Sequence, residues 1–220
     1  IFWYRIYPPP YEPLLPSIAV LPFTRIGEAP DTDAIAVGLA EELLSSLTKL
    51  EELSVSSRIA AEYVRDRLSP LSEIAASLKI RYLVEGSVQK EANRVRVTVQ
   101  LIDAKDNDHV WSDNYEEQVG RLLNIRSQMA EDIVRGLGVA LPIDAAKTLS
   151  SSPTDNGEAF VHYLQGKEYL RRSRNEVNLA AAARRFYHAT EADPRFAAAF
   201  AGLCQAHLGH FIMENDSEWF

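Results

Sequence analysis

Two neighbouring stretches, RYLVEGSVQK (residues 81–90) and RVRVTVQLID (residues 94–103), decide the fold of this chain. The second alternates polar residues with Val95, Val97, Val99 and Leu101, and the first alternates in the same way through Tyr82, Val84, Gly86 and Val88. A period of two places one side-chain set on each face of a sheet. Asn93 falls in the short turn between them, so the pair predicts a β-hairpin with one buried face.

Shorter elements precede the hairpin. Residues 17–23, SIAVLPF, predict a buried strand, and a polar loop follows over residues 24–32. We expect Asp33 to cap a helix that runs to about Leu50, because apolar residues then recur at helical spacing. A second short strand is predicted at residues 53–56.

The remaining elements complete the first region. A short helix is one interpretation of residues 58–68, and Ser69 with Pro70 starts another. A fifth strand is predicted at residues 109–115, and a helix capped by Asn124 then stops near Pro142. The order βαβαβββα predicts a mixed five-stranded α/β sheet with packed helices, parallel where helices connect the strands and antiparallel in the final meander.

The chain becomes all helical after a polar linker at residues 148–157. Asp155 and Glu158 predict a capping box at the start of the first helix. Small and aromatic residues then follow the tetratricopeptide pattern, namely Gly166, Tyr169, Ala182, Phe186, Ala189 and Pro194. A second unit begins at Ala197 and is incomplete. One repeat cannot bury its apolar face alone, so either further repeats follow or the helices dock on the α/β region.

Composition limits the classes of function and of stabilising bond that this chain can have. The 220 residues carry a formal net charge of −8, which argues against direct binding to nucleic acid. Two basic clusters, residues 171–174 and 184–185, are either solvated helix faces or a partner patch. The single cysteine, Cys204, cannot form an internal disulfide bond.

The amino-terminal residues 1–16 are unusual. Residues 1–7, IFWYRIY, are apolar and aromatic, and five prolines lie between residues 8 and 16. Aromatic residues gather where a membrane helix leaves the lipid. This segment is therefore either the end of a transmembrane helix or an extended membrane-proximal arm packed on the domain.

Five phrases support a family resemblance: SIAVLPF (17–23), GLAEELLSSL (38–47), YLVEGSV (82–88), RVRVTVQLIDA (94–104) and HVWSDNYE (109–116). As a set they resemble the region between the membrane helix and the tetratricopeptide repeats of bacterial membrane-bound adenylate cyclases, CadC-like winged-helix transcription regulators and related kinases. The resemblance implies a TolB-N-terminal-like α/β domain at residues 17–147 and a tetratricopeptide-type region at 158–220. It also implies a cytoplasmic output domain, one transmembrane helix and a periplasmic location for this region.

Catalytic, cofactor and metal motifs are not predicted. Neither a phosphate-binding glycine loop nor a zinc motif is found, and His207 with His210 would make a weak metal site at best. We expect Glu41 and Glu42 to lie on a solvated helix face and not to serve as acid and base, and Trp111 is either a sheet-packing aromatic or an interface anchor. We expect partner-binding residues on the concave face of the repeat, at Tyr163, Lys167, Arg171 and Gln205, unless that face docks on the α/β region. A ligand loop is a second possibility, at Asp31 and Asp33, because ligands favour the carboxyl edge of parallel strands.

These observations favour a non-catalytic, extracytoplasmic sensory and protein-interaction region of a single-span bacterial signalling protein. The expected partner is a protein or peptide, or a second copy of the chain, with the membrane reached through an upstream helix. Two alternatives remain open: a soluble tetratricopeptide adaptor scaffold, in the cytoplasm or periplasm, and a small-ligand-binding α/β receptor domain.

Overall fold

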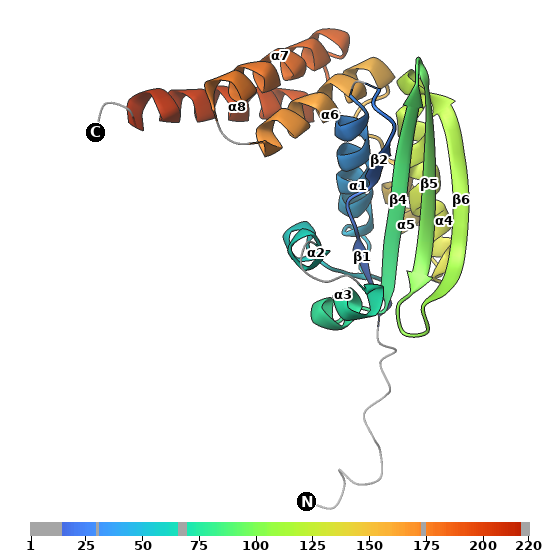
Figure 1. Cartoon of the computed structure of the whole chain (residues 1–220). Helices are drawn as coiled ribbons and strands as arrows, with labels where there is room; N and C mark the ends of the chain where they lie inside the picture. Colours follow the sequence, from blue (N-terminus) through green and yellow to red (C-terminus); the bar gives the residue numbers. More distant parts are fainter. Residues whose placement is uncertain (1–14, 30, 66–69, 173–174, 217–220) are drawn as a thin grey trace, which may run out of the picture.

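The computed structural model describes residues 15–29, 31–65, 70–172 and 175–216 (Figure 1). The strands are β1 (Ser17–Val20), β2 (Thr24–Ile26), β3 (Ser54–Val55), β4 (Tyr82–Glu91), β5 (Arg94–Asp103) and β6 (Asp108–Gln118). The helices are α1 (Thr32–Leu47), α2 (Arg58–Arg65), α3 (Leu71–Leu78), η2 (Val119–Arg121), α4 (Leu122–Gly136), α5 (Ile143–Ser150), α6 (Gly157–Arg171), α7 (Glu176–Ala192) and α8 (Ala197–Asp216). The predicted cap at Ser69, most of the arm at 1–16 and the end of the second repeat lie outside the described ranges.

The sheet has six strands in the described part of the chain, so the prediction of five was wrong. Its order is β3-β1-β4-β5-β6, with β2 also paired to β4, and the β1, β2 and β3 pairings are parallel. The additional strand, β2, falls in the segment predicted as a loop. Pairing with β4 stops after Val20 and resumes at Thr24 with the register shifted by one residue. Pro22, which has no backbone N–H, lies in this interruption.

The two faces of the sheet differ. Alternate residues of β4 and β5 point to one face, where α1 and α4 cover them in the largest hydrophobic cluster. On the other face a smaller cluster joins α2 and α3 to the β1 and β4 end of the sheet. Beyond that cluster the outer face carries polar residues of β4, β5 and β6. The hairpin prediction is confirmed, since β4 and β5 pair from Tyr82–Asp103 to Glu91–Arg94.

Three helix starts differ from the predictions. α4 begins at Leu122, so the predicted cap Asn124 lies in its first turn. α1 begins at Thr32, so Asp33 lies in its first turn, and the Thr32 hydroxyl donates to the Ala29 carbonyl at 2.7 Å. The cap of α6 is Asn156, whose side-chain oxygen accepts from two backbone N–H groups at 3.0 and 3.1 Å. Asp and Asn are almost equally good caps, so sequence alone could not choose between Asp155 and its neighbour.

Helix α6 packs directly on the α/β region. Phe160 and Leu164 are fully buried and belong to the same hydrophobic cluster as the inner face of the sheet. A Cβ atom on Gly38 of α1 would lie 2.7 Å from Leu164, so the glycine permits the close approach of the two helices. The predicted linker begins inside α5, because that helix continues to Ser150. The sheet and the first helix of the carboxyl-terminal region therefore share one core.

Candidate interaction surfaces

The predicted partner residue Lys167 lies at the contact between α6 and α1. Its ammonium group donates to Glu42 at 3.0 Å and forms an ion pair with Glu41 at 2.8 Å. Burial lowers the pKa of Lys167, but the two carboxylates outweigh that effect and raise the pKa above its ordinary value. The side chain holds the helical region on the sheet region. Glu41 and Glu42 are accordingly ion-paired and not on a solvated face.

Of the other three predicted partner residues, Tyr163 contacts Lys167, whose ammonium group lies 5.4 Å from the centroid of the tyrosine ring. Tyr163 packs against Phe196 and Phe186, with ring centroids 5.0 and 5.9 Å apart, and burial raises the pKa of its hydroxyl group. Arg171 is exposed and donates to Glu168 of its own helix at 2.9 Å. Gln205 lies exposed on α8. The structure thus does not bring the four residues together in one groove.

The predicted ligand loop is open to solvent. Asp31 has a left-handed backbone with φ of 65° and precedes α1 without a side-chain cap. Asp33 forms an ion pair with Arg25 of β2 at 3.3 Å, and both side chains are about half exposed.

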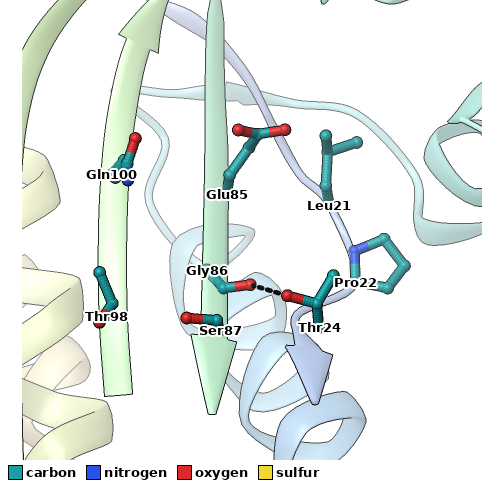
Figure 2. A pocket seen from close by; sticks show the side chains of 8 residues that line it. All are labelled: Leu21, Pro22, Thr24, Glu85, Gly86, Ser87, Thr98 and Gln100. Atoms are coloured by element: carbon teal, nitrogen blue, oxygen red, sulfur yellow. Dashed lines mark hydrogen bonds between the residues drawn. The ribbon is translucent and has the colours of Figure 1, made fainter. Parts of the chain in front are cut away.

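A cavity of about 240 Å³ lies instead on the outer face of the sheet (Figure 2). One wall is the β1–β2 connection at Leu21 and Pro22, and the floor is polar, with Thr24, Glu85, Gly86, Ser87, Thr98 and Gln100. A Cβ on Gly86 would lie 2.8 Å from the Phe23 ring, so this position must remain small. The sequence analysis did not predict this cavity. Its only signal in the sequence was that polar residues occupy the positions of the hairpin between the buried apolar ones.

Helix α8 carries a row of exposed apolar side chains. Phe200, Leu208 and Ile212 are 48%, 55% and 46% exposed, and with the exposed Cys204 they recur every four residues. The opposite side of α8 packs on α7, where the Phe186 ring lies between Gly166 of α6 and Gly202 of α8. We call the four residues Phe200, Cys204, Leu208 and Ile212 the α8 row. Residues four apart share one helix face, so the row forms a continuous apolar surface.

The structure also shows the surroundings of Trp111 and of the histidine pair considered as a metal site. Trp111 packs against the main core, and the neighbouring Tyr115 hydroxyl donates to Asp132 of α4 at 2.8 Å. Within the described ranges, no group of three or more potential metal-binding side chains converges, and His207 lies exposed on α8. None of the helices in those ranges is long and apolar enough to cross a bilayer.

The described fold is a mixed sheet with helices packed on it and a helical extension. Residues 15–131 match the model of the HilA/YgeH-like transcriptional regulator, second domain. That match covers more than half of the chain. The chain therefore belongs to the HilA/YgeH-like regulator family through this second domain.

A relative extends the similarity beyond that domain. The chain is 29% identical over 205 residues to the protein named "Putative adenylate cyclase 3" of Rhizobium meliloti (strain 1021). The alignment covers 93% of this chain but 35% of that protein, so the chain spans about a third of its relative's length.

Solved structures similar to this chain include TolB from Acinetobacter baumannii, with 20% identity, 56% of this chain and 28% of that chain covered, and a TM-score of 0.43. A lipoprotein from Neisseria meningitidis is 15% identical, and the match covers 57% of this chain and 99% of the lipoprotein, with a TM-score of 0.40. The carboxyl-terminal domain of LpoB from Salmonella enterica is 17% identical, and the match covers 47% of this chain and 83% of that domain, with a TM-score of 0.38.

Proposed function

We propose that this chain is a non-catalytic sensory and protein-interaction region of a single-span bacterial signalling protein, located outside the cytoplasm. The family membership and the cyclase relative support a role in signalling. The aromatic and proline-rich residues 1–16 support a membrane helix upstream. In this proposal α6, α7 and α8 form tetratricopeptide-type packing, supported by the glycine and aromatic contacts around Phe186.

The α8 row is the observation that carries the interaction role. An isolated exposed leucine is ordinary, but large apolar side chains in register along one helix make a surface that water solvates poorly. Covering that surface with an apolar face of a protein partner removes it from water and favours association. A second copy of the chain is one such partner.

Cys204 permits a direct test because it is exposed, lies within the row and is the only cysteine of the 220 residues. The full-length protein would be expressed with every cysteine outside this region replaced, and intact and permeabilised cells would be treated with a membrane-impermeant maleimide. We expect labelling of intact cells, since the region is outside the cytoplasm. Labelling only after permeabilisation would overturn the proposed location.

The interaction role is tested with the same label. Replacement of Phe200 and Leu208 by serine should increase the rate of Cys204 labelling in the full-length protein and change its signalling output. The matched control replaces Ile59 and Val177, which are 72% and 75% exposed on other helices, by serine. Equal labelling and equal output for both double variants would contradict a docking role for the α8 row.

The cavity in Figure 2 favours a second candidate function, a receptor for a small polar ligand. Its lining offers one carboxylate, three hydroxyl groups and one amide, which suit hydrogen bonding to a small ligand. Screening small polar compounds by thermal shift, with Ser87→Leu to fill the cavity, tests this candidate. A compound that stabilises both proteins equally does not bind there.

A further inference from the structure

A basic cavity on α6 and α7 has no role in the functions proposed above. Its volume is about 260 Å³, and its lining is Tyr169, Ala181, Arg184, Arg185 and His188. The four α7 residues lie three or four positions apart and therefore share one face of that helix. Ala181 contributes only a methyl group, which leaves room between the longer side chains.

Two arginines of this cavity carry charge without compensation. No hydrogen bond or ion pair joins Arg184 or Arg185 to another residue in the described part of the chain, although the protein as a whole carries a formal net charge of −8. Arg171 and Arg172 nearby differ, because both donate to the buried carboxylate of Glu168. The charges of Arg184 and Arg185 therefore remain available to a ligand.

A pair of histidines lies beside the cavity. The rings of His162 and His188 lie 5.4 Å apart. Burial lowers the pKa of His162, and the charges of Arg185 and His188 lower it further. The acidic groups facing the pair are at the rim: Glu191 contacts His188 at 3.2 Å, and Glu158 lies 4.0 Å from His162.

A third guanidinium stands at the side of the cavity. Arg172 lies over the Tyr169 ring, 5.1 Å from its centroid, and this contact orients the aromatic ring that forms one wall. Aromatic and guanidinium groups on adjacent helices thus surround a space that has positive charge on the α7 side. Guanidinium groups match the paired oxygens of phosphate in geometry and charge.

We propose that this cavity binds the phosphate or pyrophosphate group of a small soluble ligand, with Arg184 and Arg185 as the anion-binding residues and His188 as a further donor. The proposal is independent of the α8 row and of the cellular location of the region. The sequence alone allowed the two arginines to be either a solvated helix face or a partner patch. The proposal gives them a third role, as a site for a small anion.

The test uses inorganic pyrophosphate as the probe, at constant ionic strength, with binding followed by NMR. In the native protein we expect the imidazole signals of His188 and His162 to shift on titration, while the signal of His109 on β6 stays unchanged. Replacement of both Arg184 and Arg185 by glutamine should weaken binding at least tenfold. This loss of affinity is also measurable by calorimetry.

The control replaces Arg94 and Arg96 by glutamine, which removes two positive charges whose side chains are exposed on strand β5. That variant should bind pyrophosphate within twofold of the native protein. Equal weakening in both double variants would show non-specific attraction and overturn the site. If the Arg184 and Arg185 variant fails to fold, the native histidine shifts decide, since unchanged His188 and His162 signals would also overturn it.

Discussion

Truncation of Leu164 tests whether α6 is part of the core of the sheet region. The side chain is fully buried between α6 and α1 and contacts Gly38, which has no side chain to fill a cavity. Leucine-to-alanine changes in cores cost about 2–5 kcal/mol, with the larger values where the site cannot collapse. For Leu164→Ala we therefore expect a loss of about 3–4 kcal/mol in the free energy of unfolding.

The loss should be visible as a lower melting temperature. For a domain of this size, 1 kcal/mol corresponds to about 2–4 °C, so a loss of about 3 kcal/mol lowers the melting temperature by about 6–12 °C. Leu208→Ala is the matched control, because the same atoms are removed from a side chain that is 55% exposed. Its effect should stay within about 0.5 kcal/mol.

Two probes make the experiment decisive. With Trp3 and Trp219 replaced by phenylalanine, Trp111 fluorescence reports the sheet, and far-ultraviolet circular dichroism follows the helices throughout the protein. A shared core predicts that both signals change together and that Leu164→Ala shifts both. A sheet transition that is unaffected by Leu164→Ala, or an effect no larger than that of Leu208→Ala, would refute the reasoning.

Two further predictions concern close packing and charge. Gly166→Ala should destabilise the protein by about 1–3 kcal/mol in urea unfolding, since a Cβ there would lie 2.7 Å from the Phe186 ring. Replacing a helix glycine by alanine usually raises the free energy of unfolding slightly, and such an increase here would contradict this contact. Asp103 accepts two hydrogen bonds from Arg81, at 2.8 and 2.9 Å, which hold the pKa of its carboxyl group below the usual range. The stability from this pair is present above about pH 4 and is lost as pH falls through the lowered pKa. Asp103→Asn should therefore flatten the acid limb of a plot of the free energy of unfolding against pH. Superimposable acid limbs for the two proteins would exclude the pair as a source of stability.

Sequence periodicity predicted the elements that have one buried face. The alternation of β5 and the leucine stripe of α1 each follow directly from burial on one side, and both elements formed where expected. The strand β2 was missed because its three residues are all exposed and so carry no apolar alternation. It pairs only because the longer β4 continues alongside it, which is information from another part of the chain.

The candidate sites were harder to predict, for a physical reason. The repeat pattern predicted that Tyr163 and Lys167 lie on one helix face, but a pattern does not say what covers that face. Here Glu41 and Glu42 of α1 lie against it, more than 120 residues away in sequence. The basic cavity likewise forms between α6 and α7, and its arginines look like ordinary surface residues in the sequence. The α8 row lies on one helix, and its sequence spacing does not say whether another segment covers it.

The position of the helical region is fixed by polar contacts as well as by the core. The buried guanidinium group of Arg126 on α4 donates to the Ser46 hydroxyl of α1 at 2.8 Å and to the Ser151 carbonyl after α5 at 2.7 Å. Burial lowers the pKa of Arg126, and an ionised group this deep is costly unless its donors are satisfied. Its Nη atoms donate to these partners, whereas its Nε has no hydrogen-bond partner among the described residues. Movement of α6 and the segment before it away from the sheet region would break the Arg126–Ser151 hydrogen bond and the contacts of Lys167 with α1 together. A partner bound to α8 should therefore reorient the sheet and helices as one body, and a signal that depends on such a partner would pass through the position of the whole region, not through a hinge between its parts.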